Sequence, residues 1–569
     1  MNHNRICPAL KRVFCVLLLL FSLVLTLRTA WVVSFTLLDS DTSSELILGQ
    51  KLAREGGIMS SSWLYSTELQ VIDSHVVYSL LFRVCSDWST VRFIGSVLMN
   101  LMMLGSFAFL SRQARIPFNR FCVGGAALML PFSIPYGRII LYHNYYSFHV
   151  FFSFLMVGLY LGALRRLRNQ EWKRWPFPVF LGCLALTAFV TGLAGVRHLM
   201  ICIVPLAVAS VLCALMDEKR RDGETGIVRK CDGILLSLIP LAFAGAGYLI
   251  NLNVLEEKYT FTNFSDQTIS MGGFADLHKV LYNTFVDLGF QDFQKLFSAE
   301  GLLGIAGVIV WIVFVILAVH TARRTEEPSA RFLQVFALTV QFIMACVFIF
   351  LSGAELLHLL YLLPVLVWII PALSGADLRK DYGADPGSGT GKKKAADVLF
   401  AGDAPLSVHS LLGTLAALLL AVNGIFYSGF FRDPKSMPLE YTGLQYNDTS
   451  TVAGLRPVAD YLKENGYTMV YASYWDAAVI TELSDGTVQS VPVQEGTHKH
   501  PIKYMTWMSD TKLWDPENVA QKKVAVAANM ELAYAIEDFE KLGAAKLTSI
   551  GGYTLFELPD PAALAKDLD

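Results

Sequence analysis

The stretch VFCVLLLLFSLVLTLRTAWVVSFTL (13–37) is followed at once by the acidic stretch LDSDTSSE (38–45). About 20 apolar residues are enough to cross the ~30 Å hydrocarbon core of a bilayer, so 13–37 is expected to be a membrane span. It is too long for the apolar part of a secretory signal, and no small-residue cleavage site follows, which predicts a retained anchor. The acidic stretch would then begin where the chain leaves the membrane.

Composition extends this interpretation to most of the chain. Of 569 residues, 17% are charged and 54% hydrophobic, whereas soluble domains carry about a quarter charged residues. We therefore predict a polytopic α-helical membrane protein with about eleven transmembrane helices. The net charge of −2 gives no reason to expect nucleic-acid binding. Beyond the first, the predicted spans lie near 91–110, 121–136, 146–164, 177–194, 197–216, 232–251, 301–320, 332–352, 355–373 and 408–430.

The distribution of Lys and Arg predicts the orientation. With the N-terminus in the cytoplasm, the inner segments hold 24 Lys and Arg and the outer loops hold 8, as the positive-inside rule requires. The expectation is a multi-pass protein of the cell membrane with long outer loops at 38–90 and 252–300. The Gly- and Lys-rich segment 374–407 reads as a flexible cytoplasmic loop. An odd number of spans places the C-terminal part outside.

Residues 431–569 lack the long apolar runs of the membrane part, 1–430, and alternate instead between short expected helices and strands. Helices are expected over 455–465, 476–483 and 531–542, the second starting at an Asp cap. Strands are expected over 468–473, 488–493 and 523–528. The pair Gly551-Gly552 between two short apolar runs predicts a hairpin of 547–550 with 553–557. Alternating strands and helices indicate a small extracytoplasmic α/β domain.

The acids after the first span are candidates for chemistry. If 41–52 is helical, Asp41 and Glu45 share one face. Either Asp39 or Asp41 can simply cap that helix, but capping does not explain an Asp-Ser-Asp pair together with Glu45. An ionised carboxylate here suits a general base that takes a proton from a hydroxyl. The same pair can instead bind a divalent cation that holds a phosphate, and both options stay open.

Two predicted outer loops combine aromatic and basic side chains. Tyrosines at a span end are ordinary interface residues, and an Arg near the bilayer can simply extend to the headgroups. Several basic groups on one side also suit a phosphate, because Arg makes bidentate contacts. The residues concerned are Arg138, Tyr142, His143 and Tyr145 in the loop 136–147, and Arg197 and His198 in the turn 195–198.

Together these motifs resemble the GT-C superfamily of membrane glycosyltransferases. The acidic motif, Glu55-Gly56-Gly57, Trp63-Leu64-Tyr65-Ser66-Thr67, the aromatic loop 142–147 and the Gly-Val-Arg-His turn carry the resemblance. Within the superfamily, roughly residues 10–430 look like the bacterial relatives of protein O-mannosyltransferases and of aminoarabinose lipid A transferases (glycosyltransferase family 39-like).

The resemblance implies transfer of a sugar from a polyprenyl-phosphate donor to a glycan, lipid or protein acceptor on the outer face, with membrane lipids as surroundings. Asp41 is the implied base and Asp39 the second candidate, because relatives often show adjacent Asp-Glu where this chain has Asp-Ser-Asp. A cation held by these two Asp, as in oligosaccharyltransferases, is the metal-dependent variant. Implied phosphate ligands are Arg138, His143, Arg197 and Lys258, and implied substrate contacts are Glu45, Tyr65, Tyr142, Tyr145 and His198.

Two other functions compete with an enzyme. A transporter or flippase for a lipid-linked sugar would place ionisable residues deep within the spans, and mid-span carboxylates are absent from the predicted spans. A non-catalytic protein of envelope assembly would bind a partner through its outer domain and tolerate loss of Asp39 and Asp41. Transfer assayed with a labelled polyprenyl-phosphate sugar distinguishes all three.

Overall fold

The computed structural model describes residues 3–66, 69–218, 227–261, 277–290, 297–325, 327–350, 408–432, 448–496, 502–529, 531–532, 536–541 and 543–561. Its contacts divide the chain into two compact units, each described by itself. The bundle unit comprises Met1–Arg28, Leu98–Ile250 and Asp266–Gly429. The sheet unit comprises Thr29–Val97, Asn251–Ser265 and Phe430–Asp569.

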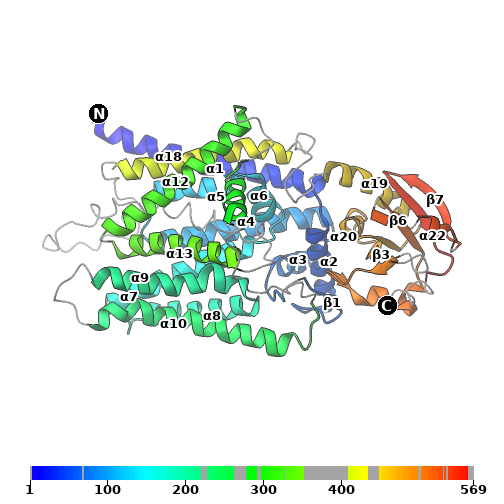
Figure 1. The fold of residues 1–569 in the computed structure, drawn as a ribbon, viewed down its shortest axis with the longest axis horizontal. Coiled ribbons are helices and arrows are strands. Elements are labelled where there is room, and N and C mark those ends of the chain that lie inside the picture. Colours follow the sequence, from blue (N-terminus) through cyan, green and yellow to red (C-terminus); the bar gives the residue numbers. More distant parts are fainter. Residues whose placement is uncertain are drawn as a thin grey trace. The chain divides into compact units, whose positions relative to one another are not determined.

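The bundle unit is built from long apolar helices (Figure 1). Eight helices in the described residues are long and apolar enough to cross a membrane, so the protein is a multi-pass membrane protein. Three helices of this unit, α1, α4 and α18, extend into the residues of the sheet unit. The helices of this unit are α1 (His3–Thr36), α4 (Trp88–Gln113), α5 (Phe118–Leu128), α6 (Ile134–Tyr136), η1 (Gly137–Tyr142), α7 (Ser147–Arg168), α8 (Pro176–Leu193), η2 (Leu199–Ile203), α9 (Val204–Glu218), α10 (Ile227–Ile250), α11 (Leu277–Asp287), α12 (Ala299–Arg324), α13 (Pro328–Phe350) and α18 (Val408–Arg432).

These helices confirm most of the predicted spans and correct one of them. The predicted span 121–136 is not one helix, since α5 ends at Leu128 and residues 129–133 are not helical. Pro131 and Pro135 explain the break, because proline lacks an N–H and disfavours helix in the residue before it. The predicted span 355–373 and the predicted loop 374–407 lie outside the described residues.

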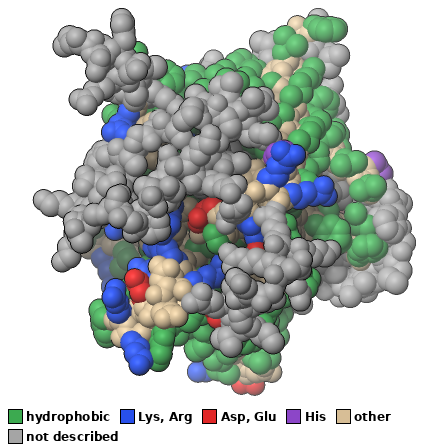
Figure 2. Space-filling view, turned by 90° about the vertical axis from the view of Figure 1, so that its left-hand side faces the viewer, with side chains coloured by type: hydrophobic (Ala, Val, Ile, Leu, Met, Phe, Trp, Pro, Cys, Tyr) green, Lys and Arg blue, Asp and Glu red, His purple; other side chains and the backbone are tan. Residues whose placement is uncertain are grey.

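Basic residues mark several helix ends of the bundle unit. Helices α4, α7 and α12 each carry Arg in their last turn. Figure 2 looks onto one end of the molecule and shows Lys and Arg side chains gathered there. Cations in the last turn also complement the negative end of a helix dipole. The predicted cytoplasmic placement of these ends stays a prediction.

The sheet unit contains a six-stranded mixed sheet of order β4-β3-β2-β6-β8-β7. Its central strands β3, β2 and β6 are parallel, and β2 and β6 are buried along their whole length. Burial of every residue of a parallel strand is typical of a sheet whose two faces are both covered by other elements. The elements of this unit are α2 (Ser40–Glu55), β1 (Trp63–Leu64), α3 (Ser74–Phe82), η3 (Asn251–Leu255), α19 (Asp448–Glu464), β2 (Met469–Ser473), α20 (Tyr474–Leu483), β3 (Gln489–Glu495), β4 (Ile502–Tyr504), β5 (Ser509–Asp510), η7 (Thr511–Trp514), α21 (Pro516–Val519), β6 (Val524–Ala528), α22 (Ile536–Lys541), β7 (Ala545–Ile550) and β8 (Tyr553–Glu557).

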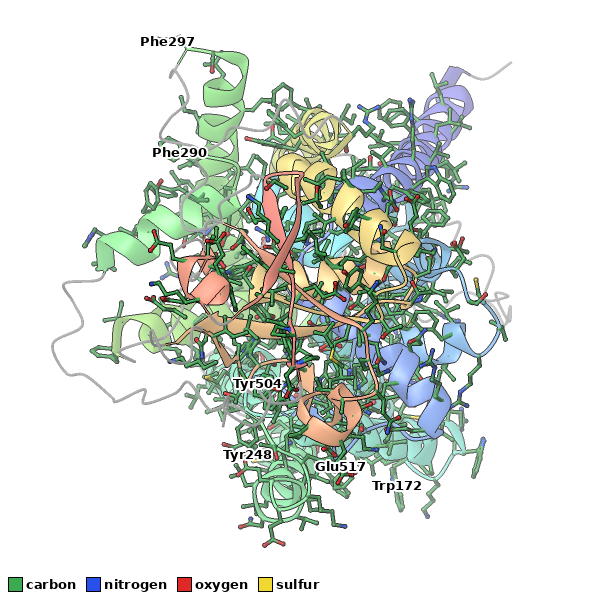
Figure 3. All side chains as sticks on the ribbon, turned by 90° about the vertical axis from the view of Figure 1, so that its right-hand side faces the viewer. Trp172, Tyr248, Phe290, Phe297, Tyr504 and Glu517 are labelled. Carbon is green, nitrogen blue, oxygen red and sulfur yellow. The ribbon has the colours of Figure 1, made fainter. Side chains whose placement is uncertain are left out.

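The predicted α/β character of the C-terminal part is confirmed. The hairpin forms as predicted, with Gly551 and Gly552 both at positive φ, as its turn requires. Tyr504 stacks on Trp514 with ring centroids 4.5 Å apart inside the unit, whereas Glu517 is exposed on α21 (Figure 3). Described helix α22 is shorter than the predicted helix 531–542.

The loop after the first span folds with the C-terminal strands and helices. Strand β1 pairs antiparallel with β5, so Trp63 lies opposite Asp510. Helix α2 packs closely on α3: a Cβ added at Gly49 would lie 2.5 Å from the Cβ of Tyr78, so the contact requires glycine. Residues separated by several hundred positions thus form one structure around the start of α2.

Candidate functional site

Helix α2 begins at the acidic motif, and Asp39 is its N-cap. The side chain of Asp39 accepts hydrogen bonds from the Thr42 amide and the Thr42 hydroxyl, both at 3.0 Å. It is 6% exposed. The capping alternative is therefore confirmed for Asp39, and its carboxylate is used to start the helix.

Asp41 lies in the first turn of α2 and is half-buried. The hydroxyl of Tyr474, from the start of α20, donates a hydrogen bond to Asp41 Oδ1. Burial, followed by the charge of Asp41, raises the pKa of Tyr474 well above its usual value, so the phenol stays protonated and serves as a donor. The positive end of the α2 dipole also favours a negative charge here.

A buried ion pair between Arg92 of α4 and Glu482 of α20 also binds Ser43 of α2. Glu482 of α20 accepts hydrogen bonds from Arg92 Nε at 2.5 Å and from the Ser43 hydroxyl at 2.6 Å. Arg92 Nη2 also donates to Ser43 at 3.2 Å and contacts Glu482 Oε2. All three residues are buried. The network fixes the turn that carries Asp41 relative to the helix that carries Tyr474.

Glu45 lies one turn beyond Asp41 and pairs with α3. Its Oε2 accepts from the Ser74 hydroxyl at 3.1 Å and lies 3.2 Å from His75 Nδ1. Burial alone lowers the pKa of His75, but the hydrogen bond and charge of Glu45, with the charge of Asp73, raise it overall. The predicted helical face of Asp41 and Glu45 is present, with both carboxylates engaged by other elements.

Tyr65 and Lys258 also belong to the sheet unit, in different settings. Tyr65 is 4% exposed, and its hydroxyl accepts from the Ser60 amide at 2.8 Å. It packs in an apolar cluster with Trp63 and Tyr474. Lys258 is exposed in the turn after η3. Tyr65 therefore supports the loop from inside, whereas Lys258 faces its surroundings.

The predicted aromatic and basic loops are neighbours within the bundle unit. Arg197 Nη1 donates to the Tyr146 hydroxyl at 2.8 Å, which joins the turn 195–198 to the loop 136–147. Arg138 lies on η1, a π-helical turn of a kind that is rare and frequent at functional sites. Arg138, Tyr142 and His143 are buried, and Tyr145 is half-buried with its ring edge-on to His143 at 5.8 Å.

His149, which the sequence reasoning missed, lies beside this pair of loops. Its ring stacks on His198 with centroids 4.4 Å apart and planes 5° apart. Both rings are buried, and neither nitrogen of His149 has a hydrogen-bond partner in the described part of the chain.

Each acid of the motif has its Oδ1 engaged within the protein. Asp39 Oδ1 faces the Thr42 amide, whereas Asp41 Oδ1 accepts from Tyr474. Across the described ranges, no group of three or more His, Cys, Asp or Glu is placed to hold a metal ion. Since a hard cation needs several oxygens directed at one point, the predicted metal-dependent alternative gains no support from this donor set.

Besides His149, the sequence did not identify Tyr474, Glu482 and Arg92 as site residues. Tyr474 is 433 positions from Asp41, and Glu482 is 390 positions from Arg92. The available signal was local: Arg92 is a charge near the start of an apolar span, and such charges are usually paired. No spacing rule relates it to Glu482.

Solved structures of two kinds of protein are among those similar to this chain. Crystal structures of ArnT from Cupriavidus metallidurans match in the apo state (13% identity, 97% of this chain and 98% of that chain, TM-score 0.48) and bound to undecaprenyl phosphate (12%, 95% and 97%, 0.47). The oligosaccharyltransferase of Archaeoglobus fulgidus with Zn and sulfate matches at 13% identity (90% and 68%, 0.39). No protein-family model and no curated protein matches the chain. ArnT and this oligosaccharyltransferase are both GT-C glycosyltransferases, the class that the motifs resemble.

Proposed function

We propose that this protein is a membrane glycosyltransferase that moves a sugar from a polyprenyl-phosphate donor to an acceptor hydroxyl on the outer face. The observation that carries the proposal is Asp41, a half-exposed carboxylate in the first turn of α2, held by a protonated Tyr474. Such a carboxylate is oriented by a hydrogen bond and partly accessible, and a general base needs both properties.

Asp41 is a better candidate than Asp39 for a structural reason. The Asp39 carboxylate is buried and already satisfies the Thr42 amide at the helix start. Asp41 accepts a hydrogen bond from the Tyr474 hydroxyl, and a carboxylate can accept a second one from an acceptor hydroxyl. The structure around Asp41 therefore already accommodates the interaction that the reaction requires.

The reaction is a single displacement at the anomeric carbon of the donor sugar. Asp41 takes the proton of the acceptor hydroxyl, and the acceptor oxygen forms a bond to that carbon. The bond from the carbon to the phosphate oxygen breaks, and the lipid phosphate leaves with the electron pair. Configuration at the carbon inverts. A neutralised phosphate is a good leaving group, so cations assist departure without a separate acid.

The residues for the phosphate are proposed from the basic loops. Arg138 and Arg197 lie in the neighbouring loops of the bundle unit, and His143 shares the first of them. Lys258 is an exposed cation in the sheet unit. Tyr142, Tyr145 and His198 are proposed sugar contacts from the same loops.

The test uses full-length protein in liposomes with a labelled polyprenyl-phosphate sugar and a panel of hydroxyl acceptors. Asp41→Asn should lower transfer about 10²–10⁴-fold, the usual contribution of a general base, with unchanged thermal stability. Asp39→Asn is the matched control: it should cost up to about 1 kcal/mol of stability and retain most of the transfer.

Full activity in Asp41→Asn overturns the role of Asp41. Translocation of the labelled lipid by the wild-type protein without any transfer would instead indicate the transporter. An inactive wild type with both Asp dispensable for cell-envelope integrity would indicate a non-catalytic assembly protein.

A further inference from the structure

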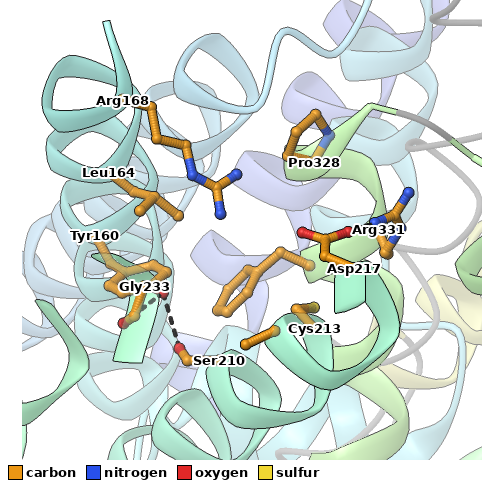
Figure 4. Close-up of a pocket in the computed structure, with 11 residues that line it drawn as sticks. Tyr160, Leu164, Arg168, Ser210, Cys213, Asp217, Gly233, Pro328 and Arg331 are labelled. Atoms are coloured by element: carbon orange, nitrogen blue, oxygen red, sulfur yellow. Dashed lines mark hydrogen bonds and ion pairs between the residues drawn. The ribbon is translucent and has the colours of Figure 1, made fainter. Parts of the chain in front are cut away.

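Four helix ends of the bundle unit enclose a small hollow, away from the loops described above (Figure 4). Helices α7 and α9 contribute their C-terminal ends, and α10 and α13 contribute residues near their N-terminal ends. Among the predicted inner segments, those around 165–174, 219–230 and 323–331 adjoin these ends. The hollow would thus open toward the predicted cytoplasmic side.

Hydroxyl groups line its inner part. The Tyr160 hydroxyl and the Ser210 hydroxyl are 2.8 Å apart, and Tyr160 also lies 3.1 Å from the Gly233 carbonyl. The empty space is about 20 Å³, enough for one water-sized group. A single water or a single oxygen atom of a larger molecule can therefore enter beside these hydroxyls.

The charges around the hollow do not balance. Arg331 is 5% exposed, contacts Asp217 and donates to the Thr325 carbonyl at 2.6 Å. Its Nε has no acceptor in the described ranges. Arg168 is half-buried, and its guanidinium points into the hollow (Figure 4). Two guanidinium groups with one carboxylate leave one positive charge without a described partner, and a partly buried charge is costly unless it is paired.

The side chain of Arg168 differs from those of Arg165 and Arg166 in having no hydrogen-bond or ring partner in the described ranges. Arg165 donates to the Gln113 carbonyl at 3.2 Å and to the Gln113 side chain at 2.9 Å. Arg166 donates to the Gly162 carbonyl at 2.8 Å and lies 3.9 Å from the centre of the Phe180 ring. In the part of the chain that the structure describes, Arg168 makes no such contact. Extension toward lipid headgroups explains a partnered Arg at a helix end, but not a side chain directed at a hollow.

We propose that this hollow binds the phosphate group of an anionic molecule, either a phospholipid headgroup or free phosphate. Arg168 binds the phosphate, since guanidinium matches its geometry in bidentate fashion, and the buried Arg331 contributes positive charge from inside. One phosphate oxygen enters the space beside the Tyr160 and Ser210 hydroxyls, and the rest stays at the opening. Binding joins the ends of four helices and stabilises the bundle. This site is independent of the proposed transfer reaction.

The experiment measures thermal unfolding of the full-length protein, delipidated in a neutral detergent. Phosphatidylglycerol should raise the unfolding temperature of the wild type by about 5 °C at saturating concentration, and phosphatidylcholine should not. Inorganic phosphate is compared with chloride at equal ionic strength. An effect of phosphatidylglycerol alone identifies a headgroup, and an equal effect of inorganic phosphate identifies free phosphate.

Matched variants test the residues. Arg168→Gln should lose the stabilisation, whereas Arg174→Gln, which removes the same charge from an exposed side chain paired with Glu171 at 3.5 Å, should keep it. Asp217→Asn, which adds to the charge imbalance, should increase the shift, and it supplies the test should Arg168→Gln fail to fold. No shift in the wild type, an undiminished shift in Arg168→Gln, or an unchanged shift in Asp217→Asn overturns the proposal.

Discussion

Two arginine–carboxylate clusters in this protein are built in opposite ways. In the sheet unit, one arginine and one carboxylate, Arg92 and Glu482, share a buried network with the Ser43 hydroxyl. In the bundle unit, Arg168 and Arg331 face a hollow that has one carboxylate, Asp217. The first cluster is closed and neutral, and the second is open and positive.

The difference separates two uses of charge. A neutral, fully hydrogen-bonded pair has nothing left for a ligand, so its effect is to hold elements in place. A cluster with surplus charge gains free energy when an opposite charge arrives from outside. Charge balance within a cluster therefore helps to distinguish positioning groups from binding groups in this molecule.

The largest effect is expected from breaking the closed cluster. Arg92→Met leaves Glu482 buried without its cation, which should cost about 3–5 kcal/mol of stability. Arg92→Met combined with Glu482→Met should cost clearly less, because no buried charge then remains. Denaturant unfolding of the full-length protein in detergent provides the measurement. A double variant as unstable as the single one would show that the cluster acts through shape and not through charge.

The next largest effect is expected in the pH dependence of stability, through Asp476. Its carboxylate accepts hydrogen bonds from Ser473 at 2.9 Å, Asn529 at 2.6 Å and Tyr553 at 3.0 Å. Contrary to the predicted Asp cap, α20 begins two residues earlier, and Asp476 is a buried acid within its first turn. Burial raises its pKa to about 6 from the usual 3.8.

The direction of the pH effect on stability follows from the number of protons bound by the folded and the unfolded protein. Between pH 3.8 and about 6 the folded protein holds a proton that the unfolded chain has released. This group therefore lowers stability as pH rises through that window, by up to about 3 kcal/mol. Unfolding temperatures at pH 4.5 and 7 should differ less in Asp476→Asn than in the wild type. The exposed Asp460→Asn is the control, and equal pH dependence in all three proteins contradicts the prediction.

The smallest effect is expected at the contact that adjoins the closed cluster, between Tyr474 and Asp41. Tyr474→Phe keeps the ring and removes the donor, which should lower transfer about tenfold, the value of one hydrogen bond to a charged group. Because the lost donor favoured the ionised carboxylate, the acidic limb of the pH profile of transfer should move to higher pH. Lower transfer with an unmoved profile would assign Tyr474 to packing alone.

Local sequence patterns were sufficient to predict most of the helices and strands. Runs of apolar residues predicted the spans, Asp39 or Asp41 as the cap of a helix over 41–52 was one of the alternatives considered, and Gly551-Gly552 predicted the hairpin. Each depends on backbone and solvent preferences that act over a few residues. The failure at 121–136 was also local, because hydropathy hid two prolines that interrupt the helix.

The amino-acid sequence by itself determined that this chain crosses a membrane many times and that it contains an acidic segment after the first span and a small α/β domain. Only the tertiary structure decided which of the two acids caps the helix and which meets Tyr474, and that Arg92 finds Glu482 while Arg168 is turned to a hollow. Those outcomes depend on which surfaces pack together over hundreds of residues, and a hydrogen bond formed across such a separation leaves no periodic trace in the chain.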